Sequence, residues 1–135
     1  MDAKPPVLIV EDEPGLRHLL RLTLSQDFEV DEARDGEEAL RRVAERPYPL
    51  ILLDVMLPGM DGYSICDVIR QMPNGQGAKI VFCTGRGGIA GRARGRECGA
   101  EAYIVKPFSP TALLAQLKAI LAAPPADETA CPQPS

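Results

Sequence analysis

Four short apolar runs recur along this chain, and they constrain its fold more than any other feature. They occupy residues 7–10, 50–53, 80–83 and 103–105 and are rich in Val, Ile and Leu. Continuous apolar runs of this length are typical of strands buried on both faces of a sheet. A shorter, more polar run at residues 28–33 predicts a further strand.

Segments in which apolar residues have helical spacing separate these strands. Four of the segments begin at residues that suit helix starts: Pro14, Asp35, Asp61 and Ser109. Glu38 follows Asp35 at the spacing of a capping box. Alternating strands and helices predict an α/β fold, with a five-stranded parallel sheet, doubly wound, and helices on both faces in three layers.

The stretch at residues 85–98 is rich in Gly and Arg and predicts a weak fourth helix within about 88–98. Gly91 and Gly95 lie inside it, and an interior glycine costs about 1 kcal/mol of helix stability relative to Ala. We expect this helix to be the softest element. Replacing both glycines by Ala should stiffen it, unless close packing requires a bare backbone there.

Length, charge and cysteines limit the functions to consider. A chain of 135 residues suits one domain, here residues 1–122, and the Pro-rich residues 123–135 predict a disordered tail or the start of a linker. The net charge of −4 gives no signal for nucleic acid or anionic membrane. None of the four cysteines forms a C-x-x-C pair. With no signal peptide or membrane-length apolar run, we expect a reduced, cytoplasmic protein.

Polar residues gather where the predicted strands end. Glu11 and Asp12 follow the first strand, Asp54 ends the third, Thr84 the fourth and Lys106 the fifth. In an open α/β sheet, ligands bind outside the carboxyl ends of the strands. Three crowded carboxylates need a cation, and Mg²⁺ takes oxygen ligands and phosphate oxygens. A lysine ammonium and a threonine hydroxyl opposite them would hold a phosphoryl group.

Four sequence blocks carry a resemblance to a known family. They are VLIVEDE at residues 7–13, LDVMLPGMDG at 53–62, CTG at 83–85 and GAEAYIVKPF at 99–108. In this order, and at matching strand ends, they resemble the response-regulator receiver domains of two-component signalling. The resemblance covers roughly residues 7–121 and implies a flavodoxin-like, chemotaxis-regulator-like fold with strand order 2-1-3-4-5 and five helices.

The resemblance implies a role for each carboxylate. Asp54 would be the phosphoacceptor, its carboxylate attacking phosphorus. Asp12 and Asp54 would bind Mg²⁺ directly, and Glu11 would act through water. The backbone carbonyl of Met56 would complete the protein ligands, and Mn²⁺ could replace Mg²⁺.

The resemblance also assigns the switching residues. Lys106 would pair with a phosphoryl oxygen, or with Asp54 when no phosphoryl group is present, and the Lys106–Pro107 bond would be cis. Thr84 would move toward the phosphoryl group, and Tyr103 would change rotamer to fill the vacated space. We expect the Lys106 ammonium at an exposed edge, where it positions charge more than it stabilises the fold.

These residues also have plainer interpretations. Asp54 could cap the helix that follows it. Glu11 and Asp12 could form a solvated turn favoured by the dipole of the next helix. Thr84 could be a residue that merely favours strands, and a strand tyrosine such as Tyr103 more often only packs. His18 lies away from the sheet edge and is expected to be a surface residue rather than a phosphodonor.

The implied function is a switch rather than an enzyme, with only self-catalysed phosphorylation and dephosphorylation. The donor would be a cognate sensor histidine kinase or a phosphotransferase. The face formed by the fourth helix, fifth strand and fifth helix would control a downstream target protein or a missing C-terminal effector domain. We expect no direct binding of nucleic acid or membrane by this segment.

Some positions depart from the usual family pattern. Gly85 stands where Ala is usual after Thr84, which should loosen the loop that closes on the phosphoryl group. Ala102, Ala112 and Gln116 replace charged residues that form ion pairs in one common dimer of the family. Those pairs cannot form here, so we expect a monomer or a weak dimer.

Three other functions fit less well. A haloacid-dehalogenase-type hydrolase would have Asp-x-Asp after the first strand, where this chain has Glu-Asp-Glu. A flavodoxin-like FMN carrier would need a Thr/Ser/Gly phosphate loop there. RNA binding would depend on four arginines, which are Arg86, Arg92, Arg94 and Arg96. However, the chain is acidic and has few aromatic residues on which bases could stack.

Overall fold

Five parallel strands form one sheet, as the sequence pattern predicted, and their order is β2-β1-β3-β4-β5, as the family resemblance implied. The computed structural model describes residues 4–85 and 89–122. The strands are β1 (Pro6–Val10), β2 (Glu29–Ala33), β3 (Leu50–Leu53), β4 (Lys79–Thr84) and β5 (Ala102–Val105). The helices are α1 (Pro14–Leu24), α2 (Gly36–Glu45), α3 (Gly62–Gln71), α4 (Ile89–Glu97) and α5 (Pro110–Ala122), with a short 3₁₀ turn η1 (Pro73–Gly75).

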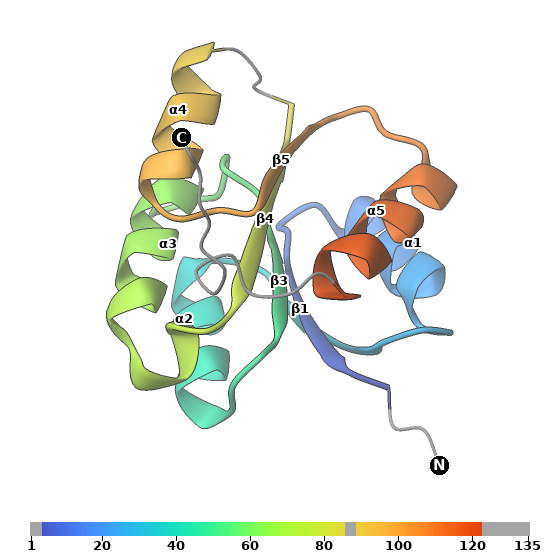
Figure 1. The fold of residues 1–135 in the computed structure, drawn as a ribbon, viewed down its shortest axis with the longest axis horizontal. Coiled ribbons are helices and arrows are strands. Elements are labelled where there is room, and N and C mark those ends of the chain that lie inside the picture. The colour runs from blue at the N-terminus through green and yellow to red at the C-terminus, as the bar shows by residue number, and fades with distance from the viewer. Residues whose placement is uncertain (1–3, 86–88, 123–135) are drawn as a thin grey trace.

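Helices cover both faces of the sheet. Figure 1 shows α2, α3 and α4 on one face and α1 and α5 on the other. Along β1, Leu8 and Val10 belong to the core under the first group, while Val7 and Ile9 belong to the core under the second. Successive strand residues point to opposite faces, so an uninterrupted apolar run is what a strand covered on both sides requires.

Side-chain caps start the helices at the predicted residues. Asp35 accepts a hydrogen bond from the Glu38 amide at 2.9 Å, and Asp61 accepts one from the Ser64 amide at 2.8 Å. The capping box of α2 is only half formed, because the Glu38 carboxylate accepts from the amide of Arg34 instead of that of Asp35.

The register of the sheet brings the predicted site together. Val10 of β1 is paired with Leu53 of β3, and Thr84 of β4 with Val105 of β5. The residues that follow these partners therefore emerge beside one another at the carboxyl edge. The predicted tail at residues 123–135 and the loop at 86–88 lie outside the described residues.

The described part of the fourth helix supplies no side chain to the core. None of its side chains that the structure describes belongs to the buried apolar set, and the nearest member is Cys98, just after it. Its two interior glycines serve packing. A Cβ on Gly91 would lie 2.6 Å from the Tyr103 hydroxyl, and one on Gly95 would lie 3.3 Å from the Phe82 ring. The exception made for close packing therefore applies at Gly91, where Ala should displace Tyr103 rather than simply stiffen α4.

Amide hydrogen exchange should show α4 as the softest described helix. Because two interior glycines weaken it, its amides should exchange at least about tenfold faster than those of β4. Exchange measured peptide by peptide on the unmodified protein tests this. Equal protection of α4 and β4 would contradict it.

Candidate functional site

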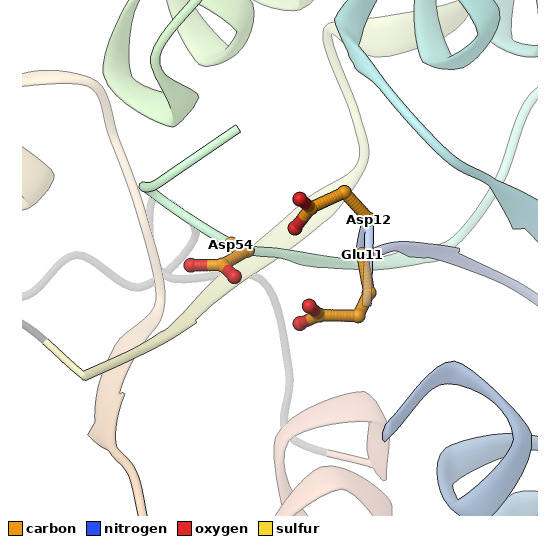
Figure 2. Close-up of side chains that lie close together, drawn as sticks. All are labelled: Glu11, Asp12 and Asp54. Carbon is orange, nitrogen blue, oxygen red and sulfur yellow. The ribbon is translucent and has the colours of Figure 1, made fainter. Parts of the chain in front are cut away.

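Three carboxylates meet at the carboxyl ends of β1 and β3. Oxygens of Glu11, Asp12 and Asp54 all lie within 4.8 Å of one another. Figure 2 shows the three side chains close together. Glu11 and Asp54 are only 3% and 5% exposed, whereas Asp12 is exposed. The sheet places them, because the Asp54 amide donates to the Val10 carbonyl at 3.1 Å.

Lys106 joins the two buried carboxylates. Its Nζ lies 3.0 Å from Glu11 Oε1 and 3.0 Å from Asp54 Oδ2. The Lys106 side chain is 23% exposed, so its ammonium is largely buried rather than exposed as expected. Because it lies between two buried carboxylates, we now expect its loss to lower stability. The pairing with Asp54 was expected, but the bond to Glu11 was not.

The pKa values of this cluster follow from burial and pairing. Burial raises the pKa of the Glu11 carboxyl above its ordinary value, and the nearby charge of Asp54 adds to this, while the hydrogen bond from Lys106 opposes it. Burial alone would lower the pKa of Lys106, but its hydrogen bonds to Asp54 and Glu11 prevail and raise it. The ammonium is therefore held in its charged form.

Backbone amides hold the remaining oxygens of the buried pair. The Glu13 amide donates to Glu11 Oε2 at 3.1 Å, and the Met56 amide donates to Asp54 Oδ1 at 3.0 Å. Met56 thus lies beside the Asp54 carboxylate. That its carbonyl serves as a metal ligand stays a prediction.

The donor set fits a hard divalent cation. Three carboxylates and one ammonium leave the cluster with an excess of negative charge, and all the candidate ligand atoms are oxygens. Mg²⁺ favours such sites, using few carboxylates and keeping several waters. Exposed Asp12 lies on the side that a hydrated ion can reach.

The ends of β4 and β5 supply the other predicted residues. Thr84 is fully buried at the end of β4, and its carbonyl accepts the Lys106 amide at 2.8 Å. The Lys106–Pro107 bond is cis, as the family resemblance implied. Tyr103, on β5, is partly buried and packs against Phe82 at 6.0 Å between ring centroids.

One arginine of the fourth helix is engaged within the chain. Arg94 is paired with Asp67 at 2.8 Å and lies over the Tyr63 ring. Arg86 lies outside the described residues, as does the side chain of Arg92. His18 is exposed on α1, as expected.

Comparison with known proteins identifies the class. The chain belongs to the response regulator receiver domain family, whose model matches residues 7–118. Receiver domains are phosphoacceptor switches of two-component signal transduction, and this chain is one of them.

Curated relatives are transcriptional regulators. The chain is 42% identical over 116 residues to the transcriptional regulatory protein ResD of Bacillus subtilis, covering 85% of this chain and 47% of ResD. It is 44% identical over 118 residues to the phosphate regulon regulator PhoB of Rhizobium meliloti, covering 87% of this chain and 52% of PhoB. The chain thus spans about half the length of the curated relatives it matches.

Solved structures agree on the fold. A CheY-like receiver domain protein from Methanospirillum hungatei superposes with a TM-score of 0.83 at 28% identity, covering 88% of this chain and 94% of that one. A putative response regulator from Chloroflexus aurantiacus gives a TM-score of 0.83 at 37% identity, covering 90% of this chain and all of that one (100%). Among the described residues, no helix has the length and apolar character needed to span a membrane.

Sequence reasoning missed one residue near the site. Tyr63, in the first turn of α3, lies with its hydroxyl 2.9 Å from that of Tyr103. No motif in the sequence relates these positions, which are 40 residues apart and meet only when α3 and β5 fold together.

Replacing Lys106 by Met tests how the carboxylates are balanced. Without Mg²⁺, the free energy of unfolding should fall by about 2 kcal/mol, because Glu11 and Asp54 stay buried without their cation. Added Mg²⁺ should restore part of this loss. Denaturant titration with and without Mg²⁺ measures both effects.

Lys118 provides the matched control. It pairs with Asp27 at 3.2 Å on the surface, and the Lys118 side chain is 54% exposed. Its replacement by Met should cost about 0.5 kcal/mol or less, whether or not Mg²⁺ is present. Equal losses in the two variants would show that the buried cluster does not depend on Lys106.

Proposed function

We propose that this chain accepts a phosphoryl group on Asp54 and passes the signal through the face formed by α4, β5 and α5. The observation that carries the proposal is the position of Asp54. Asp54 directly follows β3, and its carboxylate lies within 4.8 Å of two further carboxylates and 3.0 Å from the Lys106 ammonium. The carboxyl edge of the sheet then holds a nucleophile, a cation site and a cationic hydrogen-bond donor for phosphoryl oxygens.

The proposed chemistry is attack of an Asp54 oxygen on phosphorus. The donor is a phosphohistidine of a sensor kinase or phosphotransferase, or a small acyl phosphate. The bond from phosphorus to the donor breaks as the new P–O bond forms, and the leaving nitrogen or oxygen keeps the electron pair. The product on the chain is an acyl phosphate.

The residues around Asp54 have distinct parts in this proposal. Asp12 and Asp54 hold Mg²⁺, with Glu11 acting through water and Met56 through its carbonyl; Mn²⁺ can substitute. When bound, the ion offsets phosphoryl negative charge. Lys106 exchanges its contact with Asp54 for one with a phosphoryl oxygen. Its ammonium stays positively charged throughout, so it can stabilise the negative charge of the phosphoryl group.

The proposed output begins at Thr84. Its hydroxyl turns to the phosphoryl group, and Tyr103 changes rotamer in response. Support comes from the hydrogen bond between the Lys106 amide and the Thr84 carbonyl, which ties the end of β4 to the end of β5. α4, which two interior glycines weaken, then shifts at little energetic cost.

The partners are part of the proposal. Relatives of about twice this length suggest that a C-terminal effector domain follows the receiver, and a separate target protein is the alternative. Ala102, Ala112 and Gln116 provide no ion pairs for a dimer through α4, β5 and α5, so we propose a monomer or weak dimer. Three free cysteines fit a reducing compartment, in line with the cytoplasm.

Asp54→Asn tests the phosphoacceptor directly. Incubation with Mg²⁺ and acetyl phosphate should add one phosphoryl group to the parent chain and none to the variant, because an amide oxygen is a poor nucleophile. Intact-mass spectrometry provides the stoichiometry. Asp27→Asn, a surface change, should behave as the parent; equal labelling of Asp54→Asn would overturn the assignment.

Asp12→Asn tests the cation site. The variant should bind Mg²⁺ at least about tenfold more weakly, because it loses one of few carboxylate ligands. Calorimetric titration measures the affinity, with Asp61→Asn, which alters only a helix cap, as the control. An unchanged Mg²⁺ affinity would remove Asp12 from the site.

A further inference from the structure

Tyr63 links three elements through one hydroxyl. From the first turn of α3, its Oη donates to the Gly91 carbonyl of α4 at 3.2 Å and lies 2.9 Å from the Tyr103 hydroxyl of β5. A phenol carries a single proton. With that proton on the Gly91 carbonyl, Tyr63 accepts the hydrogen bond from Tyr103, so the two contacts support each other.

The two tyrosine hydroxyls leave no room for a side chain at Gly91. A Cβ on Gly91 would lie 2.6 Å from the Tyr103 hydroxyl and 3.0 Å from that of Tyr63. Phe82 contacts both rings, at 5.1 Å from Tyr63 and 6.0 Å from Tyr103 between centroids. Only a glycine in α4 therefore lets the two tyrosines meet beneath the helix.

Other polar contacts keep α4 near α3, but they do not involve Tyr103. Arg94 pairs with Asp67 of α3 at 2.8 Å, and the Arg70 guanidinium donates to the carbonyls of Cys98 at 3.3 Å and Gly99 at 2.7 Å. Burial, followed by the hydrogen bond with Tyr103, raises the pKa of the Tyr63 phenol, which therefore stays protonated. The Tyr63 hydroxyl thus contacts both α4 and Tyr103.

We propose that Tyr63 is a positioning residue of the switch, which holds the Tyr103 ring and α4 together in one arrangement. Rotation of Tyr103 then breaks its hydrogen bond to Tyr63. The same step weakens the hydrogen bond from Tyr63 to the Gly91 carbonyl, which holds α4. In the same structure Lys106 is paired with the Asp54 carboxylate itself. The arrangement of Tyr63, Tyr103 and α4 is therefore the one that accompanies unmodified Asp54. The inference rests on the proposed function for the role of phosphorylation.

The three tyrosines of the chain make the test direct. In protein labelled with ¹³C-tyrosine, Tyr48, Tyr63 and Tyr103 give three ring signals, and no tryptophan complicates the spectra. Tyr63→Phe removes only the hydroxyl. The Tyr103 signal should move toward its position in the phosphorylated parent. The population of the Tyr103 rotamer found there should rise about fivefold, which is the effect expected for the loss of one hydrogen bond. Amide exchange in α4 should rise by a similar factor.

Tyr48→Phe is the matched control. The Tyr48 hydroxyl is hydrogen-bonded at 2.5 Å to Asp31 of β2, at the opposite edge of the sheet from β5, so its loss should leave the Tyr103 signal and α4 exchange unchanged. An unmoved Tyr103 signal in Tyr63→Phe would overturn the proposal. The same holds if both variants loosen α4 equally, because that would be a general loss of stability.

Gly91→Ala gives a second, independent test. The added methyl should displace Tyr103, and this effect should shrink in a Tyr103→Phe background, where the atom at 2.6 Å is gone. Additive effects of the two changes on α4 exchange would contradict the proposed contact.

The two proposals can fail separately. The unmodified protein alone shows whether Tyr63 positions Tyr103 and α4. If Asp54→Asn is still phosphorylated, the proposed function fails while the response of α4 to Tyr63→Phe remains. If Asp54 is phosphorylated as proposed and Tyr63→Phe changes nothing, only the role of Tyr63 fails.

Discussion

The contact of one lysine with two buried carboxylates is the interaction on which the rest of this structure depends. Glu11 and Asp54 are almost completely buried beside exposed Asp12, an arrangement that repels itself without a cation. Lys106 supplies one positive charge from the far edge of the sheet, 3.0 Å from each buried carboxylate. The cluster is thereby stable enough to fold, and it remains negative enough to favour Mg²⁺.

The same lysine connects chemistry with shape. Its ammonium contacts the nucleophile, and its amide is bonded to the carbonyl of Thr84 at the end of β4. Two residues before it, Tyr103 reaches α3 and α4 through the hydroxyl of Tyr63. A change of charge at Asp54 therefore has a short covalent and hydrogen-bonded route to α4, the helix with two interior glycines.

Much of the fold and of the site could be predicted from the sequence, because both depend on local patterns. Apolar runs define the strands, and a polar residue at the end of each strand of a parallel sheet must lie at one edge. Contacts between distant positions carry no such signal. The Tyr63–Tyr103 pair, the bond from Lys106 to Glu11 and the need for a bare backbone at Gly91 arise only from packing.

The chemical identity of the modified residue tests the central claim most directly. Hydride reduction converts the acyl phosphate of an aspartate to homoserine, and peptide mapping then locates the product. After treatment with Mg²⁺ and acetyl phosphate, our account predicts homoserine at position 54, with no product at Glu11 or Asp12. A reduction product at another carboxylate, or a phosphoryl group that resists reduction because it sits on His18, would contradict it.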